Sequence, residues 1–183
     1  MFAYLRHHAN ILRSDARRNA NEFGAARSLA FARIPLIMSD GPTTQETTPA
    51  GDDGSGPALY AGGAFTVAGK TTAAHVAKWT GTSWTTLGSG ANNGVNGDVL
   101  AMTSFDDGSG PRLCVTGTFT SAGGVTANRI AVWDGSTWSA APIGTGTNGD
   151  VRALATIGSD LFAGGAFTTI EGVSASRIAR AAV

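Results

Sequence analysis

Three copies of one segment fill most of the chain after residue 50, and they constrain its fold more than any other feature. The copies share an opening pattern, which reads LYAGGAF from Leu59, LCVTGTF from Leu113 and LFAGGAF from Leu161. The turn before the second copy is DDGSGPR, whereas the turn before the third is only GSD. Segments that keep their length while the connections vary are expected to be packed strands.

Each complete copy predicts four short antiparallel strands. In the second copy they are expected at 99–105, 113–120, 129–133 and 137–141, and the third copy repeats the first of them at 151–157. Asn-Gly-Asp precedes the first strand of both copies, and Asp134-Gly135 separates the third strand from the fourth. These dipeptides favour tight turns with positive φ.

The second strand of each copy places a large residue, a small residue, a glycine and a phenylalanine on one face. In the second copy these are Leu113, Val115, Gly117 and Phe119. A glycine fixed at one strand position predicts that another backbone or a large ring packs close to it. Two tryptophan pairs each bracket a tight turn and are expected to pack across the hairpin. The pairs are Trp79 with Trp84 and Trp133 with Trp138.

The composition and the repeat length together indicate the fold class. The chain has 26 Gly and only 14% charged residues, which suits short strands and many turns. A repeat of about 50 residues is typical of propeller blades. The sequence predicts an all-β partial β-propeller of about two and a half four-stranded antiparallel blades. The blades are assigned to residues 51–97, 98–148 and 149–183 of one repeat region, 51–183.

Residues 1–50 differ from the repeats, with six Arg against four acidic residues. Apolar residues near the start recur at helical spacing, which predicts either a helix or a poorly structured segment. Residues 39–50 have the composition of a linker. Three interpretations stay open. The first is a secretory signal, although Arg33 and Pro35 would interrupt its apolar core. The second is a transit peptide, although such peptides are poor in acidic residues and this segment contains Asp15 and Glu22. Alternatively, a misplaced start or a frame change joined this segment to the repeats.

The order of these features resembles a known repeat. A strand ending in Gly-Gly, an aromatic residue closing the next strand and a tryptophan after a short turn are similar to kelch-like blades. Repeats of this Gly-rich kind, akin to the central domain of galactose oxidase, occur in large bacterial surface and secreted proteins. The likeness covers about residues 52–183. The second copy departs from it at Thr116, and the third has Ala181 where the tryptophan belongs.

The resemblance implies a non-catalytic module that binds protein or glycan and is part of a larger surface or secreted protein. No enzyme activity and no cofactor are expected, because the repeats hold only Tyr60, Cys114 and His75 as candidate ligands for a copper radical site. The segment that begins Asp134-Gly135 resembles the Asp box of sialidases only superficially, because its spacing differs. The alternative is the propeller portion of a glycan-active enzyme whose catalytic residues lie outside this chain. The lone Cys114 is expected to be a small buried residue.

Two acidic turns are candidate calcium sites, because clustered carboxylates suit that ion. They contain Asp52 with Asp53 and Asp106 with Asp107. The alternative is a hairpin loop stabilised by aspartate side chains. The third copy lacks the turn, so no essential metal is expected.

Partners are expected at the connections 66–74, 120–128 and 168–176, since propellers usually bind ligands at loop faces or in the central channel. The repeats carry no basic stripe, which disfavours nucleic acid. No apolar run approaches the roughly 18 residues of a membrane span. An incomplete ring would leave sheet edges and apolar faces open. The chain is therefore expected to be a fragment of a longer protein or to self-associate to close the propeller.

Overall fold

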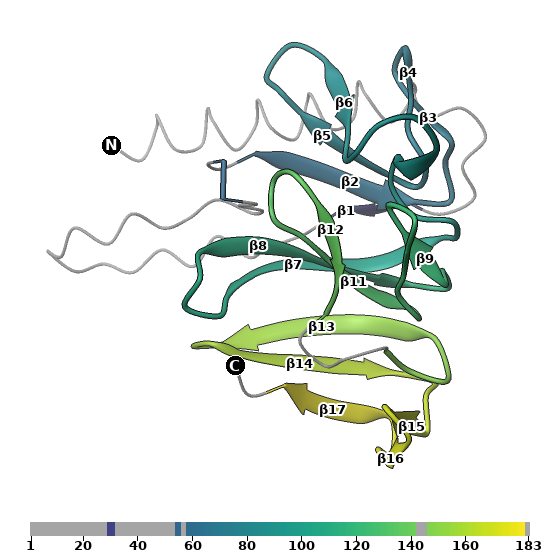
Figure 1. Cartoon of the computed structure of the whole chain (residues 1–183), viewed down its shortest axis with the longest axis vertical. Coiled ribbons are helices and arrows are strands. Elements are labelled where there is room, and N and C mark those ends of the chain that lie inside the picture. The colour runs from purple at the N-terminus through teal and green to yellow at the C-terminus, as the bar shows by residue number, and fades with distance from the viewer. Residues whose placement is uncertain (1–28, 32–53, 56–57, 142–145, 182–183) are drawn as a thin grey trace, which may run out of the picture.

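The computed structural model describes residues 29–31, 54–55, 58–141 and 146–181, and in these ranges the protein is all-β (Figure 1). Besides the strands, these ranges contain one short 3-10 helix, η2 (Gly90–Asn92). Among the described residues, the longer strands form two four-stranded sheets and one three-stranded sheet, and the shortest form three two-stranded hairpins. All pairings within these sheets and hairpins are antiparallel, and no sheet closes on itself in the described ranges.

Each sheet has its strands in chain order, from one edge to the other. The first sheet consists of β1 (Leu29–Phe31), β2 (Leu59–Gly63), β5 (Val76–Trp79) and β6 (Trp84–Thr86). The second consists of β7 (Val99–Asp106), β8 (Pro111–Gly117), β11 (Ile130–Trp133) and β12 (Trp138–Ala140). The third consists of β13 (Val151–Ile157), β14 (Asp160–Gly165) and β17 (Ile178–Ala181).

The four strands predicted for the second copy are confirmed, and β13 has the predicted bounds. β8 is shorter than expected at its end, because it stops at Gly117 and not at residue 120. The amide of Thr118 donates to the carbonyl oxygen of Asp98 at 3.0 Å, outside the β8–β11 ladder. The chain then turns into a small hairpin instead of continuing the strand.

The first sheet has one strand more than the sequence predicted. β1 pairs with β2 through Leu29 opposite Gly63 and Phe31 opposite Ala61. It holds the edge position that β7 and β13 hold in the other sheets. The expectation that this part of residues 1–50 is helical or unstructured is wrong for 29–31, since the edge of β2 offers backbone groups that the segment satisfies. The expected helix near the start and the linker at 39–50 lie outside the described residues.

Three small hairpins occupy the connections that were predicted to be loops. They pair β3 (Val67–Ala68) with β4 (Thr71–Thr72), β9 (Ser121–Ala122) with β10 (Val125–Thr126), and β15 (Thr169–Ile170) with β16 (Val173–Ser174). Each turns on two residues, and the first of the two has positive φ in all three. That residue is Gly69, Gly123 or Glu171.

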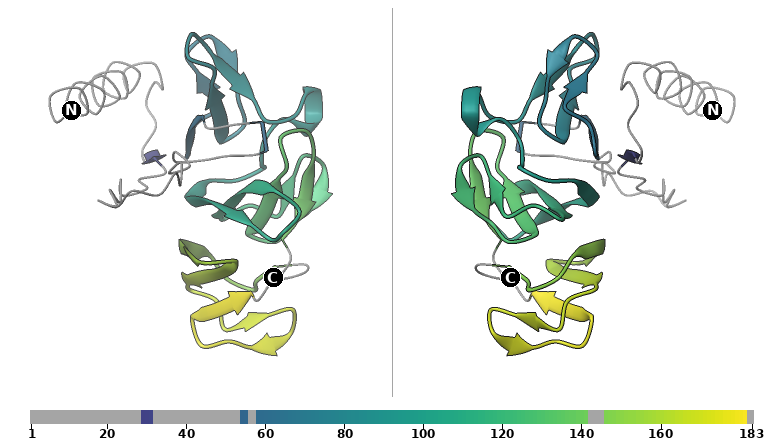
Figure 2. Two further views of the ribbon diagram at one scale, coloured as in Figure 1. Left: turned by 90° about the vertical axis from the view of Figure 1, so that its left-hand side faces the viewer. Right: turned by 90° about the vertical axis from the view of Figure 1, so that its right-hand side faces the viewer.

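The three sheets follow one another along the long axis of the molecule (Figures 1 and 2). An apolar core lies between each neighbouring pair of sheets. Tyr60 and Val76 of the first sheet share a core with Leu113 and Val115 of the second. Phe105, Cys114 and Ile130 of the second sheet share a core with Leu161 of the third. One face of the second sheet therefore covers the first sheet, and its other face is covered by the third.

The tryptophan pairs pack across their hairpins as predicted. Ring centroids are 5.3 Å apart in both, with interplanar angles of 57° for Trp79 with Trp84 and 51° for Trp133 with Trp138. Such tilted contacts add to the stability gained from burial. Trp138 also donates from Nε1 to the carbonyl oxygen of Leu87 at 2.8 Å, which ties the second sheet to the segment leaving the first.

The glycine on the patterned face of the second strand lies against another backbone, as the sequence predicted. A Cβ at Gly117 would lie 1.8 Å from the carbonyl oxygen of Asp98, and one at Gly165 would lie 2.0 Å from that of Asp150. The cause is a break in register at the start of the first strand of each sheet, between Val99 and Ala101 and again at β13. This bulge brings the incoming backbone over the glycine.

Short segments between the sheets are hydrogen bonded on both sides. The amide of Val95 donates to the carbonyl of Ala74 in the first sheet's β2–β5 connection, and the amide of Asn96 donates to Ser121 in β9. The third sheet repeats this arrangement, with Thr147 bonded to Asn128 and Asn148 bonded to Thr169. Each of these segments therefore fixes one sheet's loop edge against the next sheet's hairpin.

Candidate functional site

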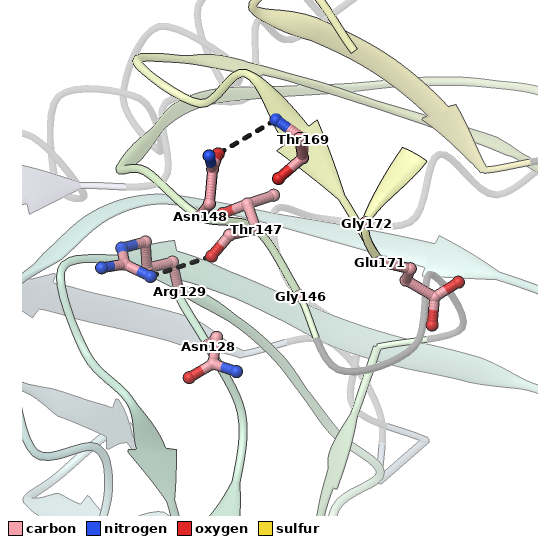
Figure 3. A pocket seen from close by; sticks show the side chains of 8 residues that line it. All are labelled: Asn128, Arg129, Gly146, Thr147, Asn148, Thr169, Glu171 and Gly172. Atoms are coloured by element: carbon pink, nitrogen blue, oxygen red, sulfur yellow. Dashed lines mark hydrogen bonds between the residues drawn. The ribbon is translucent and has the colours of Figure 1, made fainter. Parts of the chain in front are cut away.

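A polar groove of 530 Å³ lies where the second sheet's loop edge meets the third sheet's hairpin (Figure 3). Three parts of the chain line it: the start of β11, the segment before β13, and the β15–β16 hairpin. The lining residues are Asn128, Arg129, Gly146, Thr147, Asn148, Thr169, Glu171 and Gly172. Amide, hydroxyl, guanidinium and carboxylate groups are all present, which gives the groove donors and acceptors for a polar ligand.

Arg129 is fixed in the wall of the groove by its neighbours. Its backbone has φ of 68°, in the left-handed region, and its amide donates to the carbonyl of Phe119 at 2.8 Å. From the side chain, Nη1 donates to the carbonyl oxygen of Thr147 at 2.8 Å (Figure 3). Nε lies 3.8 Å from a carboxylate oxygen of Asp150. The guanidinium thus brings a positive charge to the groove at little cost in side-chain entropy on binding, because it is already held.

Asn148 holds the opposite wall in place. Its Oδ1 accepts a hydrogen bond from the amide of Thr169 at 3.0 Å (Figure 3). The same oxygen accepts from the amide of Thr168 at 2.9 Å, and Nδ2 donates to the Thr168 hydroxyl at 2.9 Å. Asn96 makes the same three bonds to Thr120 and Ser121 one sheet earlier. The asparagine is therefore structural at both sites, and the groove is built on a repeated frame.

Glu171 distinguishes this groove from the corresponding place in the other sheets. It has φ of 51° where the first two hairpins have Gly69 and Gly123, which have φ of 58° and 56°. A residue with a side chain is strained in that region, whereas glycine is not. The third hairpin therefore carries an exposed carboxylate at the rim of the groove, at a position where glycine would be more stable.

The predicted binding connections are brought together in part. The connections 120–128 and 168–176 both reach the groove, through Asn128 and through Thr169, Glu171 and Gly172. The connection 66–74 contributes no lining residue. Sequence reasoning did not single out Arg129 or Gly146. The repeated Gly-x-Asn-Gly-Asp at 94–98 and 146–150 was the available signal, but only its turn was recognised.

Comparison with protein-family models, with curated proteins and with solved structures finds no match to this chain. Within the ranges that the structure describes, no helix has the length and apolarity needed to cross a membrane.

The acidic turn at Asp106 and Asp107 has the geometry of an aspartate-stabilised hairpin. Asp106 Oδ1 accepts from the amides of Gly108 and Gly110, and Asp107 accepts from the amide and hydroxyl of Ser109. The hydrogen bond from the Ser109 hydroxyl is the main cause of a lowered pKa of Asp107, and the nearby Arg112 adds to it. These contacts match the loop interpretation offered beside calcium. The equivalent Asp52 and Asp53 lie outside the described residues.

The described residues contain no group of three His, Cys, Asp or Glu side chains placed to hold a metal ion. Cys114 is fully buried between the second and third sheets, as expected, and burial raises the pKa of its thiol. Tyr60 and Cys114 belong to different cores, and His75 lies beside Asp98, with 3.4 Å between Nδ1 and Oδ1.

Asp134 is a turn-stabilising residue in the β11–β12 hairpin. Desolvation acts to raise the pKa of its carboxyl, but hydrogen bonds from the amides and hydroxyls of Thr137 and Ser136 outweigh it and hold that pKa well below the usual value. The first repeat has Thr80 at this position, where its hydroxyl accepts from the amide of Ser83 at 3.2 Å. In both repeats, the side chain at this position thus accepts a hydrogen bond from a backbone amide of the same turn.

We expect Asp134→Ala to lower the free energy of unfolding by about 1 kcal/mol at neutral pH, since the turn is exposed. Asp134→Thr, which copies the first repeat, should cost less. Because the folded pKa is depressed, the stabilisation is present above the unfolded pKa of about 4 and is lost as pH falls through the folded value. Urea unfolding at pH 7 and pH 3 measures this. An Asp134→Ala effect that is equal at both values would contradict the assignment.

Proposed function

We propose that residues 51–183 form part of a kelch-like β-propeller that binds protein or glycan without catalysing a reaction. The arrangement of the sheets supports this proposal, because the first strands of successive sheets are neighbours. β7, the first strand of the second sheet, contacts both β1 and β13. Radial stacking about an axis puts the first strand of each blade next to the first strands of its neighbours. The Gly-rich and Trp-marked repeat supports the same arrangement.

The groove at the loop edge is the observation that carries binding. It lies on the side where the sequence placed the ligand surface, and its positive and negative groups, Arg129 and Glu171, come from different sheets. Strain at a groove residue is a known mark of a functional site. Glu171 combines a strained backbone with an exposed charge, which supports a role in holding a ligand.

The variant Glu171→Gly tests this role. We expect it to raise the free energy of unfolding by about 0.5 kcal/mol, because relief of the left-handed strain slightly exceeds the added entropy of a glycine in the unfolded chain. Ligand binding should fall at least about tenfold, as for loss of a charged hydrogen bond. Stability is measured by urea unfolding, and binding by screening wild type on arrays of neutral and acidic glycans and of extracellular proteins.

Lys70→Ala is the control, because Lys70 is a charged residue in the equivalent turn of the first hairpin and does not line the groove. It should bind as wild type does. A wild-type protein that binds nothing on either array, or a Glu171→Gly variant that binds unchanged, would contradict the proposed site.

We also propose that this module is part of a larger surface or secreted protein. The alternative, a propeller portion of a glycan-active enzyme, is favoured by no particular contact among the described residues. Turnover of the array glycans by the wild-type chain would support that alternative against ours.

A further inference from the structure

A basic residue stands directly before the third strand of each sheet, and its backbone is held in the same way each time. The three residues are His75, Arg129 and Arg177, with φ of 64°, 68° and 67°. The amide of each donates to the phenylalanine carbonyl that follows the second strand, and its own carbonyl accepts from the last glycine of that strand. Residues with a side chain rarely adopt this φ, so the fold fixes one basic side chain at the same place in all three sheets.

In the first two sheets, this basic side chain faces an aspartate that leads into the next sheet. Nδ1 of His75 lies 3.4 Å from Oδ1 of Asp98, and Nε of Arg129 lies 3.8 Å from Oδ1 of Asp150. Each aspartate ends a Gly-x-Asn-Gly-Asp segment and immediately precedes the first strand of the following sheet. The basic residue of one sheet therefore contacts the last side chain of the segment that enters the next.

The start of the same segment contacts the carbonyl group that precedes the basic residue. The amide of Val95 donates to Ala74, and the amide of Thr147 donates to Asn128, both at 3.1 Å. A Cβ on the glycine before Val95 or Thr147 would lie only 2.1 or 2.0 Å from that carbonyl oxygen. Only glycine fits there, so backbone shape as well as charge selects the segment.

The third sheet presents the same two groups, but no described residue occupies them. Ser176 and Arg177 are exposed, whereas the corresponding Asn128 and Arg129 are half-buried. Within the described ranges, the Arg177 side chain makes no ion pair or hydrogen bond, and the Ser176 carbonyl accepts no hydrogen bond. A guanidinium beside an unbonded carbonyl offers donors for a carboxylate and an acceptor for a peptide amide.

We infer that this edge, formed by Ser176 and Arg177, binds a Gly-x-Asn-Gly-Asp segment of a separate polypeptide. The Ser176 carbonyl accepts the amide of the segment's second residue, and Arg177 pairs with its aspartate. A second copy of this chain does not supply the segment, because the second residue is already buried in both places, with Val95 2% and Thr147 3% exposed. Neither Ser176 nor Arg177 lines the groove, so the inference does not depend on ligand binding there.

The first test titrates a synthetic peptide into the isotope-labelled full chain. The peptide is acetyl-Gly-Thr-Asn-Gly-Asp-Val-amide, which copies residues 146–151 and has no terminal charges. We expect saturable shifts of the amide resonances of Arg177 and Ile178, with a dissociation constant on the order of 1 mM, because only a few polar contacts form at an exposed site. The absence of saturable shifts up to about 10 mM peptide would overturn the inference.

Two altered peptides test the geometry on the unaltered protein. Asparagine in place of the aspartate removes the charge that pairs with Arg177, and alanine in place of the first glycine puts a Cβ against the Ser176 carbonyl. Each change should raise the dissociation constant at least about fivefold. If the alanine peptide binds as well as the original, the edge recognises a carboxylate alone and the inferred segment is wrong. Equal binding of all three peptides would also overturn it.

Arg177→Ala and Arg152→Ala form a matched pair of protein variants. Each removes one positive charge from the third sheet, but Arg152 is 65% exposed, pairs with Asp150 and belongs to β13, two strands away from β17. We expect Arg177→Ala to raise the dissociation constant for the original peptide at least about fivefold and Arg152→Ala to change it less than about twofold. An unchanged affinity in Arg177→Ala, or equal losses in both variants, would contradict the inferred role of Arg177.

Discussion

Substitution of Gly165 by alanine should lower the free energy of unfolding by about 3 kcal/mol, because the added methyl group overlaps main-chain atoms that have little freedom to move. The new Cβ would lie 2.0 Å from the carbonyl oxygen of Asp150 and 2.9 Å from the Cα of Val151. To relieve the overlap, the bulge at the start of β13 must open. In thermal unfolding, the loss corresponds to a fall in Tm of roughly 10 °C for a chain of this size.

The adjacent glycine is a matched control. A Cβ at Gly164 would have its nearest neighbour at 3.8 Å, and the second repeat already has Thr116 at that position. We expect Gly164→Ala to change the free energy of unfolding by less than about 0.5 kcal/mol. Similar losses of unfolding free energy from the two variants would show that the general effect of replacing a strand glycine sets the cost, and not the close approach of another backbone.

Truncation of Trp138 should have an effect of comparable size. The ring is 7% exposed, packs on Trp133 and covers Gly123, where a Cβ would lie 2.4 Å from the ring. Its Nε1 is bonded to Leu87, so the side chain joins two sheets. We expect Trp138→Ala to lower the free energy of unfolding by about 3–5 kcal/mol, measured by urea denaturation.

Trp138→Phe separates the packing of the ring from its hydrogen bond. It keeps an aromatic ring against Trp133 but removes this donor from the carbonyl of Leu87, which still accepts from the amide of Gly94 at 2.9 Å, so loss of the hydrogen bond should cost about 1 kcal/mol. If Trp138→Phe were as damaging as Trp138→Ala, the bond to Leu87 would dominate. If it were neutral, the bond between the sheets would carry no net stabilisation, and our account of this contact would be wrong.

Much of the sheet architecture could be predicted because it depends on local sequence. Tight-turn dipeptides such as Asp134-Gly135 mark strand ends, and alternation along 113–119 separates the two faces of β8. The close approach at Gly117 was predictable as well, since a glycine fixed in a strand has few other causes. These signals lie within one repeat, so three copies reinforce each of them.

The remaining features depend on contacts between segments that the pattern does not connect. β1 has no repeat signature, and its pairing with β2 follows from an open backbone edge. The small hairpins have strands of two residues, too short for alternation to be read. The groove joins Arg129 of one repeat to Glu171 of the next, so no single copy of the motif contains it.

The doubly bonded segments at 94–96 and 146–148 have a consequence for how such sheets assemble in larger numbers. Each segment is hydrogen bonded to the unit before it and to the unit after it, so together with the core between the sheets it sets the turning angle between neighbours. A constant turning angle determines how many units complete a circle. Lengthening these few residues should therefore alter the blade number of a closed ring, even with every sheet unchanged.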